Sequence, residues 1–240
     1  MTRAAAPGGD APGPQRSGQH RILSRTMPIT AQLHQDFDPF GDPEYLRRAL
    51  LPLADEPVGP EWNLGEIGDI VDASKLVGAA VLVGLVQRPQ GTHVLLTRRT
   101  DSLQHHAGQV SFPGGRIDPG DRGALDAALR EAWEEVAIEP GIIAPLGFLD
   151  PYATITGFRV LPLVANLPPD YRVIPNPGEV AAVFEVPLAP LLRGERLVER
   201  SGMLLGRSRN YWEYRVGPHR IWGATAAMLV NLARRLGTTI

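Results

Sequence analysis

The chain has 240 residues and a formal net charge of −2, with 43% hydrophobic and 21% charged residues. This composition is that of a soluble globular protein, long enough for one large domain or two small ones. The near-neutral charge gives no reason to expect nucleic acid or a membrane surface as a partner. The absence of cysteine excludes disulfides, thiolate nucleophiles and cysteine-ligated zinc.

The N-terminal segment is predicted to be disordered. Residues 1–26 are mainly Ala, Pro, Gly and Arg, too poor in apolar groups to offset the entropy of ordering. We place an extension at residues 1–35 and one domain at 36–240. No run approaches the ~18 apolar residues of a membrane span, and no apolar core of a signal peptide follows the first arginine. A cytoplasmic location is therefore expected.

The first predicted element is a short helix over residues 43–51, with Asp42 as N-cap and Pro43 in its first turn. Residues 75–86 form an apolar run rich in valine, typical of a strand buried on both faces. A turn at 87–91 and a return strand at 92–99 complete a hairpin. Further strands are predicted at 147–148, 158–165 and 180–186, and the last leads into a short helix at 188–192.

Residues 114–138 open as a glycine-rich turn and continue as a helix. At about 100° per residue, one apolar face of this helix consists of Leu125, Ala128, Leu129, Ala132 and Val136.

Three glutamates lie together on another face of the helix, which we expect to be exposed: Glu131, Glu134 and Glu135. Three like charges so close repel each other, and the arrangement makes sense if a hard divalent cation such as Mg²⁺ or Mn²⁺ lies among them. A solvated acidic surface helix is the alternative. Asp126 precedes Arg130 by four residues and could pair with it, while Arg130 could also steady a neighbouring glutamate.

The C-terminal part contains an outer strand at 209–216 and a last helix that ends at Gly237. Trp222 is expected to pack in the core at the start of this helix. The apolar stripe of the helix consists of Thr225, Met228, Leu229, Leu232 and Leu236. Strands interleaved with two substantial helices indicate a single α/β domain.

Residues 130–138, REAWEEVAI, resemble the second half of the Nudix box, G-x5-E-x7-R-E-U-x-E-E-x-G-U, where U is aliphatic. Ala137 stands where the family has glycine, and Asp121 stands near the position of the loop glutamate that braces the helix. The resemblance implies an α/β/α sandwich with a mixed sheet. It also implies Glu131, Glu134 and Glu135 as metal ligands and catalytic carboxylates.

Residues 95–115, LLTRRTDSLQHHAGQVSFPGG, resemble the signature LLTxR(S/A)x3Rx3Gx3FPGG of the coenzyme A pyrophosphatase branch. Thr100 replaces a small residue, and Gln104 replaces a second arginine that a substrate phosphate would meet. Residues 175–180 and 220–226 also resemble this branch. Glu179, in the first of these segments, is a candidate for the extra catalytic carboxylate that such sites recruit from outside the box.

The candidates for substrate binding are Arg98, Arg99, Gly114 and Gly115. Because strands alternate their faces, only one of the two arginines is expected to point at the site, and Arg99 is the candidate for phosphate. The glycines would let the backbone approach a phosphate closely. His105 and His106 are either a general base or metal ligand, or solvated loop residues.

The resemblance implies hydrolysis of the pyrophosphate linkage of coenzyme A or acyl-coenzyme A, yielding 3′-phosphoadenosine 5′-phosphate and (acyl)phosphopantetheine. Mg²⁺ or Mn²⁺ would be the cofactor, and one of the four glutamates would take the proton of the attacking water. The alternatives are a broad-specificity Nudix hydrolase acting on ADP-ribose, NADH or nucleoside triphosphates, and a module that binds a nucleotide without turnover. The substrate is a small molecule; a homodimer is compatible with the sequence, and the oligomeric state stays open.

Overall fold

The computed structural model of the protein describes residues 38–101, 107–204 and 206–238, so the predicted extension at 1–35 lies outside the described residues. No helix among the described residues is both long and apolar enough to cross a bilayer. The helices are α1 (Pro43–Ala49), α2 (Leu64–Ile67), α3 (Ala124–Val136), α4 (Leu188–Leu192) and α5 (Ala224–Arg235), with 3₁₀ turns at Pro39–Gly41, Ala73–Lys75 and Pro140–Ile142.

The main sheet is mixed and, within the described ranges, eight-stranded. Its central pair is β1 and β7, which run parallel over ten residue pairs from Val77–Phe158 to Val86–Leu167. The other pairings are antiparallel, and β4 and β8 add to β1 and β2. The strands are β1 (Val77–Arg88), β2 (Gly91–Arg99), β3 (Val110–Ser111), β4 (Gly114–Arg116), β5 (Ala144–Phe148), β6 (Tyr152–Ala153), β7 (Phe158–Leu167) and β8 (Val180–Pro187).

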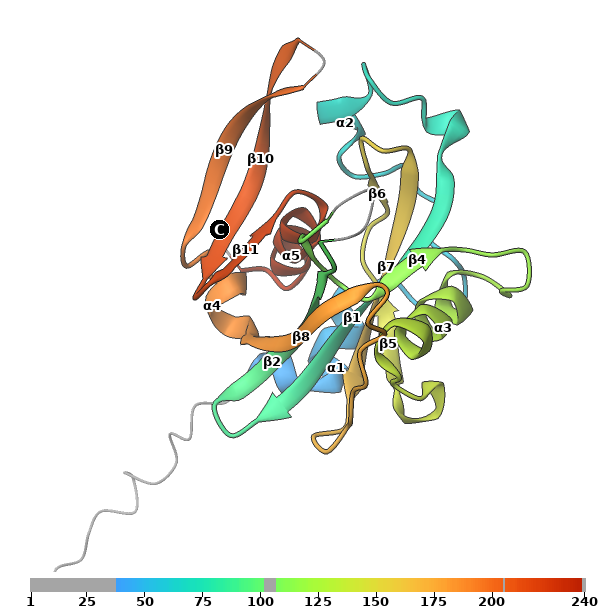
Figure 1. Cartoon of the computed structure of the whole chain (residues 1–240), viewed down its shortest axis with the longest axis vertical. Helices are drawn as coiled ribbons and strands as arrows, with labels where there is room; N and C mark the ends of the chain where they lie inside the picture. Colours follow the sequence, from blue (N-terminus) through green and yellow to red (C-terminus); the bar gives the residue numbers. More distant parts are fainter. Residues whose placement is uncertain (1–37, 102–106, 205, 239–240) are drawn as a thin grey trace, which may run out of the picture. The chain divides into compact units, whose positions relative to one another are not determined.

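Helices cover both faces of this sheet (Figure 1). On one face, Leu82 and Val86 of β1 pack with the alanines of α3. On the other, Val83 and Leu85 pack with residues of α1, α4 and α5. Because β1 is buried on both sides, its sequence is continuously apolar, as a strand at the centre of a sandwich requires. The predicted α/β/α sandwich with a mixed sheet in a single domain is confirmed.

A second, antiparallel sheet follows α4 and consists of β9 (Leu197–Leu204), β10 (Arg207–Val216) and β11 (His219–Trp222). One face of it is buried, since Tyr214 and Ile221 have no solvent exposure. The Tyr214 hydroxyl donates a hydrogen bond to the carbonyl of Leu191 at the end of α4. At the far end of the hairpin, Arg207 and Arg209 form ion pairs with Asp69.

Most predicted elements are present, including α1 with its Asp42 cap, the β1–β2 hairpin, β8 with α4 and α5. The five residues of the predicted apolar face of α3 all pack in or against the core, with Leu125 and Leu129 partly buried. The buried face is wider than predicted, since Ala124, Ala127 and Glu135 are buried as well.

Two expectations on other residues were wrong. One concerns Asp126, which pairs with Arg122 instead of Arg130. The other concerns Trp222, which lies half-buried at the end of β11, before the helix begins. The guanidinium of Arg220 covers its ring at 4.7 Å, so the residue belongs to the outer face of the second sheet.

Candidate active site

The glycine turn lies against the middle of β1 and the side of α3. Gly114 pairs with Val81 and Gly115 with Ala80. A Cβ atom at Gly114 would collide with the Ala80 carbonyl, and one at Gly115 would collide with the Glu131 carboxylate. At Gly114 the clash would be with backbone, so only glycine allows the chain to pass this close and to bring the Gly114 N–H to the acidic side of α3.

Glu135 is the most buried acid of the helix, with 3% of its surface exposed. The expectation that it is exposed was wrong, because its position on α3 faces the sheet. Its Oε2 accepts a hydrogen bond from the Gly114 N–H at 3.3 Å, and its Oε1 lies 3.5 Å from the Arg99 guanidinium. Burial raises the pKa of Glu135 to about 7, although Arg99 and the Gly114 N–H act in the opposite direction.

Glu131 lies one turn earlier, and 16% of its side chain is exposed. Burial raises its pKa, with contributions from the charges of Glu134 and Glu179, while Arg130 opposes the shift. The charges of Glu131 and Glu179 likewise raise the pKa of Glu135. Like charges this close therefore disfavour the ionised forms of Glu131 and Glu135.

Arg130 connects the helix to the loop before it. Its Nε and Nη2 donate to both oxygens of Asp121 at 3.0 Å, and Nη2 also donates to the Arg116 carbonyl at 2.9 Å. Its Nη1 donates to Glu131 at 3.0 Å and to Glu134 at 2.8 Å. Asp121 therefore braces the helix through Arg130. Glu134 is the outermost of the three glutamates, with 52% of its side chain exposed.

Glu179 reaches the cluster on the loop between β7 and β8. The Asn176 N–H donates to the Glu135 carbonyl and the Ile174 N–H to the Val136 carbonyl, which docks this loop on the end of α3. The Glu179 carbonyl in turn accepts from the Thr100 N–H at the end of β2. The open C-terminal carbonyls of the helix explain why a distant loop binds here.

The two arginines at the end of β2 point in different directions. Arg99 faces Glu135, and its buried Nε has no hydrogen-bond partner among the described residues. Arg98 instead donates to Asp101 at 3.1 Å and does not join the cluster. The β2–β8 register shifts between these two residues, and such irregularities re-aim side chains next to functional sites. His105 and His106 lie outside the described residues.

The chemical type of the glutamate side chains fits a hard divalent cation. Their donor atoms are carboxylate oxygens, which Mg²⁺ and Mn²⁺ prefer. Burial is the main cause of the raised pKa of Glu131 and of Glu135, and neighbouring carboxylates add to both shifts. Within the described ranges, no group of three or more acidic or histidine side chains is already arranged to hold an ion. The oxygens of Glu131 and Glu134 are held by Arg130, and those of Glu135 face Gly114 and Arg99.

Two features of the site could not be read from the sequence alone. One is the bidentate pairing of Arg130 with Asp121, which lies nine residues earlier instead of one turn away; the contact of Arg130 with neighbouring glutamates was expected and is confirmed. The other is the attachment of the 174–179 loop to α3, which uses only backbone groups and so leaves no residue signature.

A model of the NUDIX domain family matches residues 77–203. The chain is similar to the Nudix hydrolase NudL of Shigella flexneri, described as uncharacterized, with 43% identity over 161 residues, 67% of this chain and 83% of that protein. It is also 43% identical to NudL of Escherichia coli (strain K12) over 159 residues, 66% of this chain and 82% of the relative.

Solved structures also resemble the fold. A Nudix hydrolase from M. smegmatis, RenU, is 24% identical, with a TM-score of 0.41 over 48% of this chain and 72% of its own. The NUDIX domain of Shewanella oneidensis NrtR, solved with ADP ribose, is 23% identical, with a TM-score of 0.39 over 54% of this chain and 86% of its own.

Proposed function

The chain belongs to the NUDIX domain family, and from this premise we propose that it is a Nudix hydrolase that cleaves the pyrophosphate linkage of coenzyme A or its acyl derivatives. The observation that carries the proposal is the close grouping of Glu131, Glu135 and Glu179 beside the Gly114 N–H. Three acids at a glycine turn, two of which (Glu131 and Glu135) have raised pKa values, are suited to hydrolysis assisted by a divalent cation.

Each part of the site has a proposed task. Glu131, Glu134 and Glu135 would hold Mg²⁺ or Mn²⁺, which when bound supplies a Lewis acid for phosphate oxygens and acidifies water. A carboxylate of this group or Glu179 accepts the proton of the attacking water. Gly114 and Gly115 allow the diphosphate to approach the backbone, and Asp121 with Arg130 holds the helix in position.

Arg99 is the proposed phosphate contact of the substrate. Its guanidinium faces the cluster and its buried Nε has no partner among the described residues, so it has donors to offer to a phosphate oxygen. Arg98 is not proposed for this role, because its guanidinium donates to Asp101. The coenzyme A assignment is supported by residues 95–115, whose resemblance to that branch includes Arg99 and both glycines.

The test is a side-by-side assay of the purified full chain with Mg²⁺ or Mn²⁺ on coenzyme A, 3′-dephospho-coenzyme A, ADP-ribose, NADH and a nucleoside triphosphate, with products separated by chromatography. We expect the highest kcat/KM on coenzyme A and the release of 3′-phosphoadenosine 5′-phosphate. Equal efficiency on all substrates would establish broad specificity instead. Tight binding of one nucleotide without any product would establish a binding module.

A further inference from the structure

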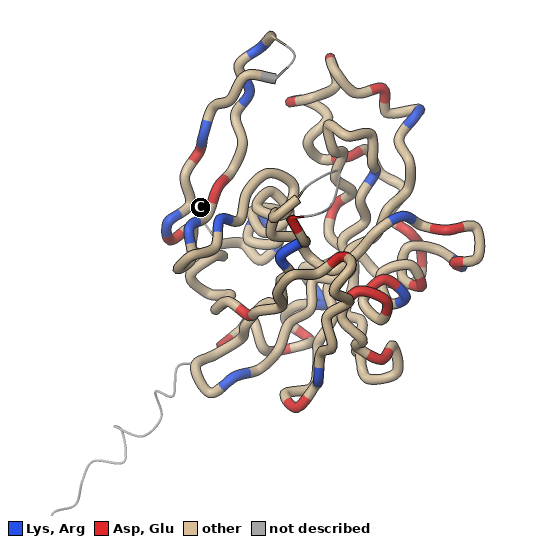
Figure 2. Tube along the Cα trace, viewed as in Figure 1, with Lys and Arg blue, Asp and Glu red and all other residues tan. Residues whose placement is uncertain are grey.

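The outer face of the second sheet carries an excess of arginine that the proposed site does not use. Side chains alternate along β10, so its odd-numbered residues share the face opposite to buried Tyr214. Register adds Arg200 of β9, opposite Tyr211, and Arg220 of β11, opposite Arg215. The basic residues on this face are Arg200, Arg207, Arg209, Arg215 and Arg220 (Figure 2).

Glu213 organises three of these arginines. Its carboxylate is 2% exposed and accepts from the Nε of Arg215 at 2.9 Å and from the Nε of Arg220 at 2.7 Å. Arg200 lies 3.9 Å from the same carboxylate. Three guanidinium groups against one carboxylate leave a net positive charge, although the protein as a whole is negative.

Glu213 leaves guanidinium N–H donors available on Arg215. Its carboxylate accepts from the Nε atoms of Arg215 and Arg220, and among the described residues the terminal nitrogens of Arg215 have no hydrogen-bond acceptor. Arg220 is held further by the Tyr211 hydroxyl at 3.2 Å and by the Trp222 ring, which itself contacts Tyr211 edge-on at 5.7 Å. A guanidinium fixed in this way loses little freedom on binding, and its fork matches the oxygens of a phosphate.

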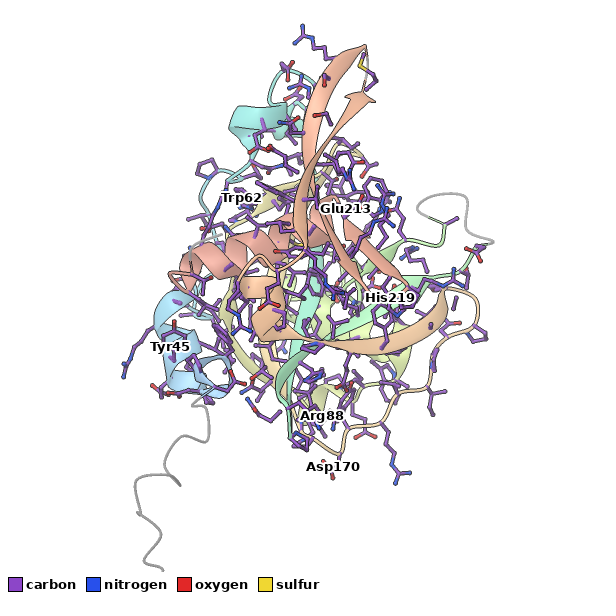
Figure 3. The ribbon with its side chains drawn as sticks, turned by 90° about the vertical axis from the view of Figure 1, so that its left-hand side faces the viewer. Tyr45, Trp62, Arg88, Asp170, Glu213 and His219 are labelled. Carbon is purple, nitrogen blue, oxygen red and sulfur yellow. The ribbon has the colours of Figure 1, made fainter. Side chains whose placement is uncertain are left out.

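The sheet that carries the cluster contacts elements of the proposed site at two places. β11 packs against β3, whose chain runs within three residues into Gly114. His219, which pairs with Val216 and lies on the other face of β11 from Arg220, stacks on Phe184 of β8 with ring centroids 3.7 Å apart. Phe184 is five residues from Glu179, or about 17 Å along a strand. Figure 3 labels Glu213 and His219, which lie at opposite ends of the β10–β11 pairing.

We propose that Arg200, Arg215 and Arg220, positioned by Glu213, form a subsite for a phosphate monoester group of the substrate that lies outside the cleaved diphosphate. This inference rests on the proposed function. It gives a binding site to the third phosphate of coenzyme A, the group that distinguishes coenzyme A from substrates with a diphosphate alone. The ligand chemistry is a phosphate dianion carried on a nucleoside.

The experiment measures binding separately from turnover. The double variant Arg215→Gln/Arg220→Gln and the wild-type full chain are titrated calorimetrically with adenosine 3′,5′-bisphosphate and with adenosine 5′-monophosphate. We expect the double variant to bind the bisphosphate at least ~10-fold more weakly, as loss of charge-assisted hydrogen bonds implies, with little change for the monophosphate. In the assay, its KM for coenzyme A should rise while kcat, and KM for the 3′-dephospho form, stay constant.

Arg193→Gln is the matched control, because Arg193 is also an exposed arginine bound through Nε to a carboxylate, that of Glu195, but lies off this face. Arg215→Lys, which keeps the charge and removes the fork, should give an intermediate loss; melting curves confirm that each variant is folded. Unchanged bisphosphate affinity, or an equal loss for both nucleotides, would overturn the proposal. If the wild-type hydrolyses no diphosphate, the proposed function fails, while the titration still tests the subsite.

Discussion

Glu135 combines deep burial with a main-chain hydrogen bond, and it is the residue on which the proposed chemistry depends most. Replacement with glutamine keeps its size and removes its charge. We expect Glu135→Gln to lower kcat by orders of magnitude and to weaken Mn²⁺ binding measured by calorimetry, while the melting temperature does not fall. The melting temperature should hold because a neutral amide is easier to bury than a charge.

Glu139→Gln is the control for this experiment, since Glu139 lies just beyond the same helix, is exposed, and makes no side-chain cap. Its activity should match that of the wild type. A Glu135→Gln protein with normal turnover would remove Glu135 from the site.

Ala137 is strained at the end of α3. It has φ 55° and ψ 34°, the left-handed conformation, at the position where the Nudix box has glycine. This conformation destabilises the folded state by about 1–2 kcal/mol for a non-glycine residue. Glycine loses more conformational entropy on folding than alanine does, which costs roughly 0.5–1 kcal/mol. We expect Ala137→Gly to raise the free energy of unfolding by about 0.5–1 kcal/mol in urea titrations.

Ala49→Gly, at the last residue of α1, is the control and should lower the free energy of unfolding by about 1 kcal/mol, since its helical conformation favours alanine. Destabilisation by both substitutions would show that the strain at Ala137 is not relieved by glycine.

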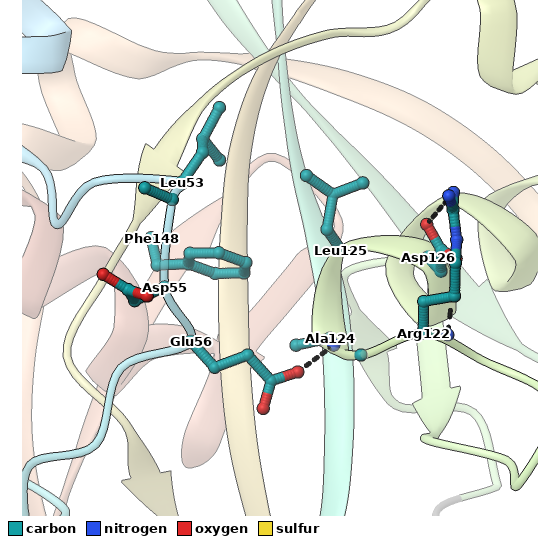
Figure 4. A pocket seen from close by; sticks show the side chains of 10 residues that line it. Leu53, Asp55, Glu56, Arg122, Ala124, Leu125, Asp126 and Phe148 are labelled. Carbon is teal, nitrogen blue, oxygen red and sulfur yellow. Dashed lines mark hydrogen bonds and ion pairs between the residues drawn. The ribbon is translucent and has the colours of Figure 1, made fainter.

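At the scale of elements, the start of α3 is capped from far away. Its own N-cap residue is Gly123, which has no side chain, and the Ala124 N–H instead donates to the Glu56 carboxylate (Figure 4). A small cavity of about 290 Å³ lies beside this contact, bordered by Leu53, Phe148 and Leu125. An acid at a helix N-terminus also interacts favourably with the helix dipole.

Glu56→Ala should therefore lower the free energy of unfolding by about 1 kcal/mol, the usual loss of an N-cap. Chemical denaturation followed by circular dichroism measures the change. Asp55→Ala, in the same loop and without a bond to the helix among the described contacts, should have little effect. Equal effects of the two substitutions would assign the loss to the loop's charge and not to the cap.

The elements predicted well are those whose residue pattern repeats, such as the apolar run of β1 and the stripe of α5. The strands missed were β3, β4, β6 and β11, which have two to four residues, and β9, whose residues show no regular alternation. In the site, the glutamates of α3 were found from their spacing. The burial of Glu135 was not, because it depends on how closely α3 approaches the sheet, which the alanines allow.

For the whole molecule, one carboxylate holds three parts of the domain together. Asp150, in the connection after β5, accepts from Arg235 at 2.6 and 2.9 Å and from Asn231 at 2.8 Å, both in α5. Arg235 also donates to the Ala49 carbonyl at the end of α1. Burial raises the pKa of Asp150, but these hydrogen bonds outweigh it, so the pKa lies below its usual value.

This shift predicts how stability depends on pH. A depressed folded-state pKa adds stability that is present above the unfolded-state pKa of about 3.9 and is lost as the pH falls through the folded value. The wild type should thus be more stable than Asp150→Asn at pH 7, and the difference in unfolding free energy should shrink below about pH 4. Asp170→Asn, at an exposed loop position, should show no such convergence; a constant difference down to pH 2 would contradict the assignment.

The parallel pairing of β1 with β7 also bears on how the chain folds. Val77 meets Phe158, so forming this pair closes a loop of roughly 80 residues, which contains β2 to β6 and α3. Such non-local contacts slow folding, because closing the loop lowers the chain entropy before the strand pairing contributes any stabilising free energy. During synthesis, the edge of β1 that pairs with β7 stays uncovered until β7 has left the ribosome. The helix α3, which carries the glutamates, lies within that loop in the sequence. Its contacts with the sheet therefore form late, after β1 and β7 have paired.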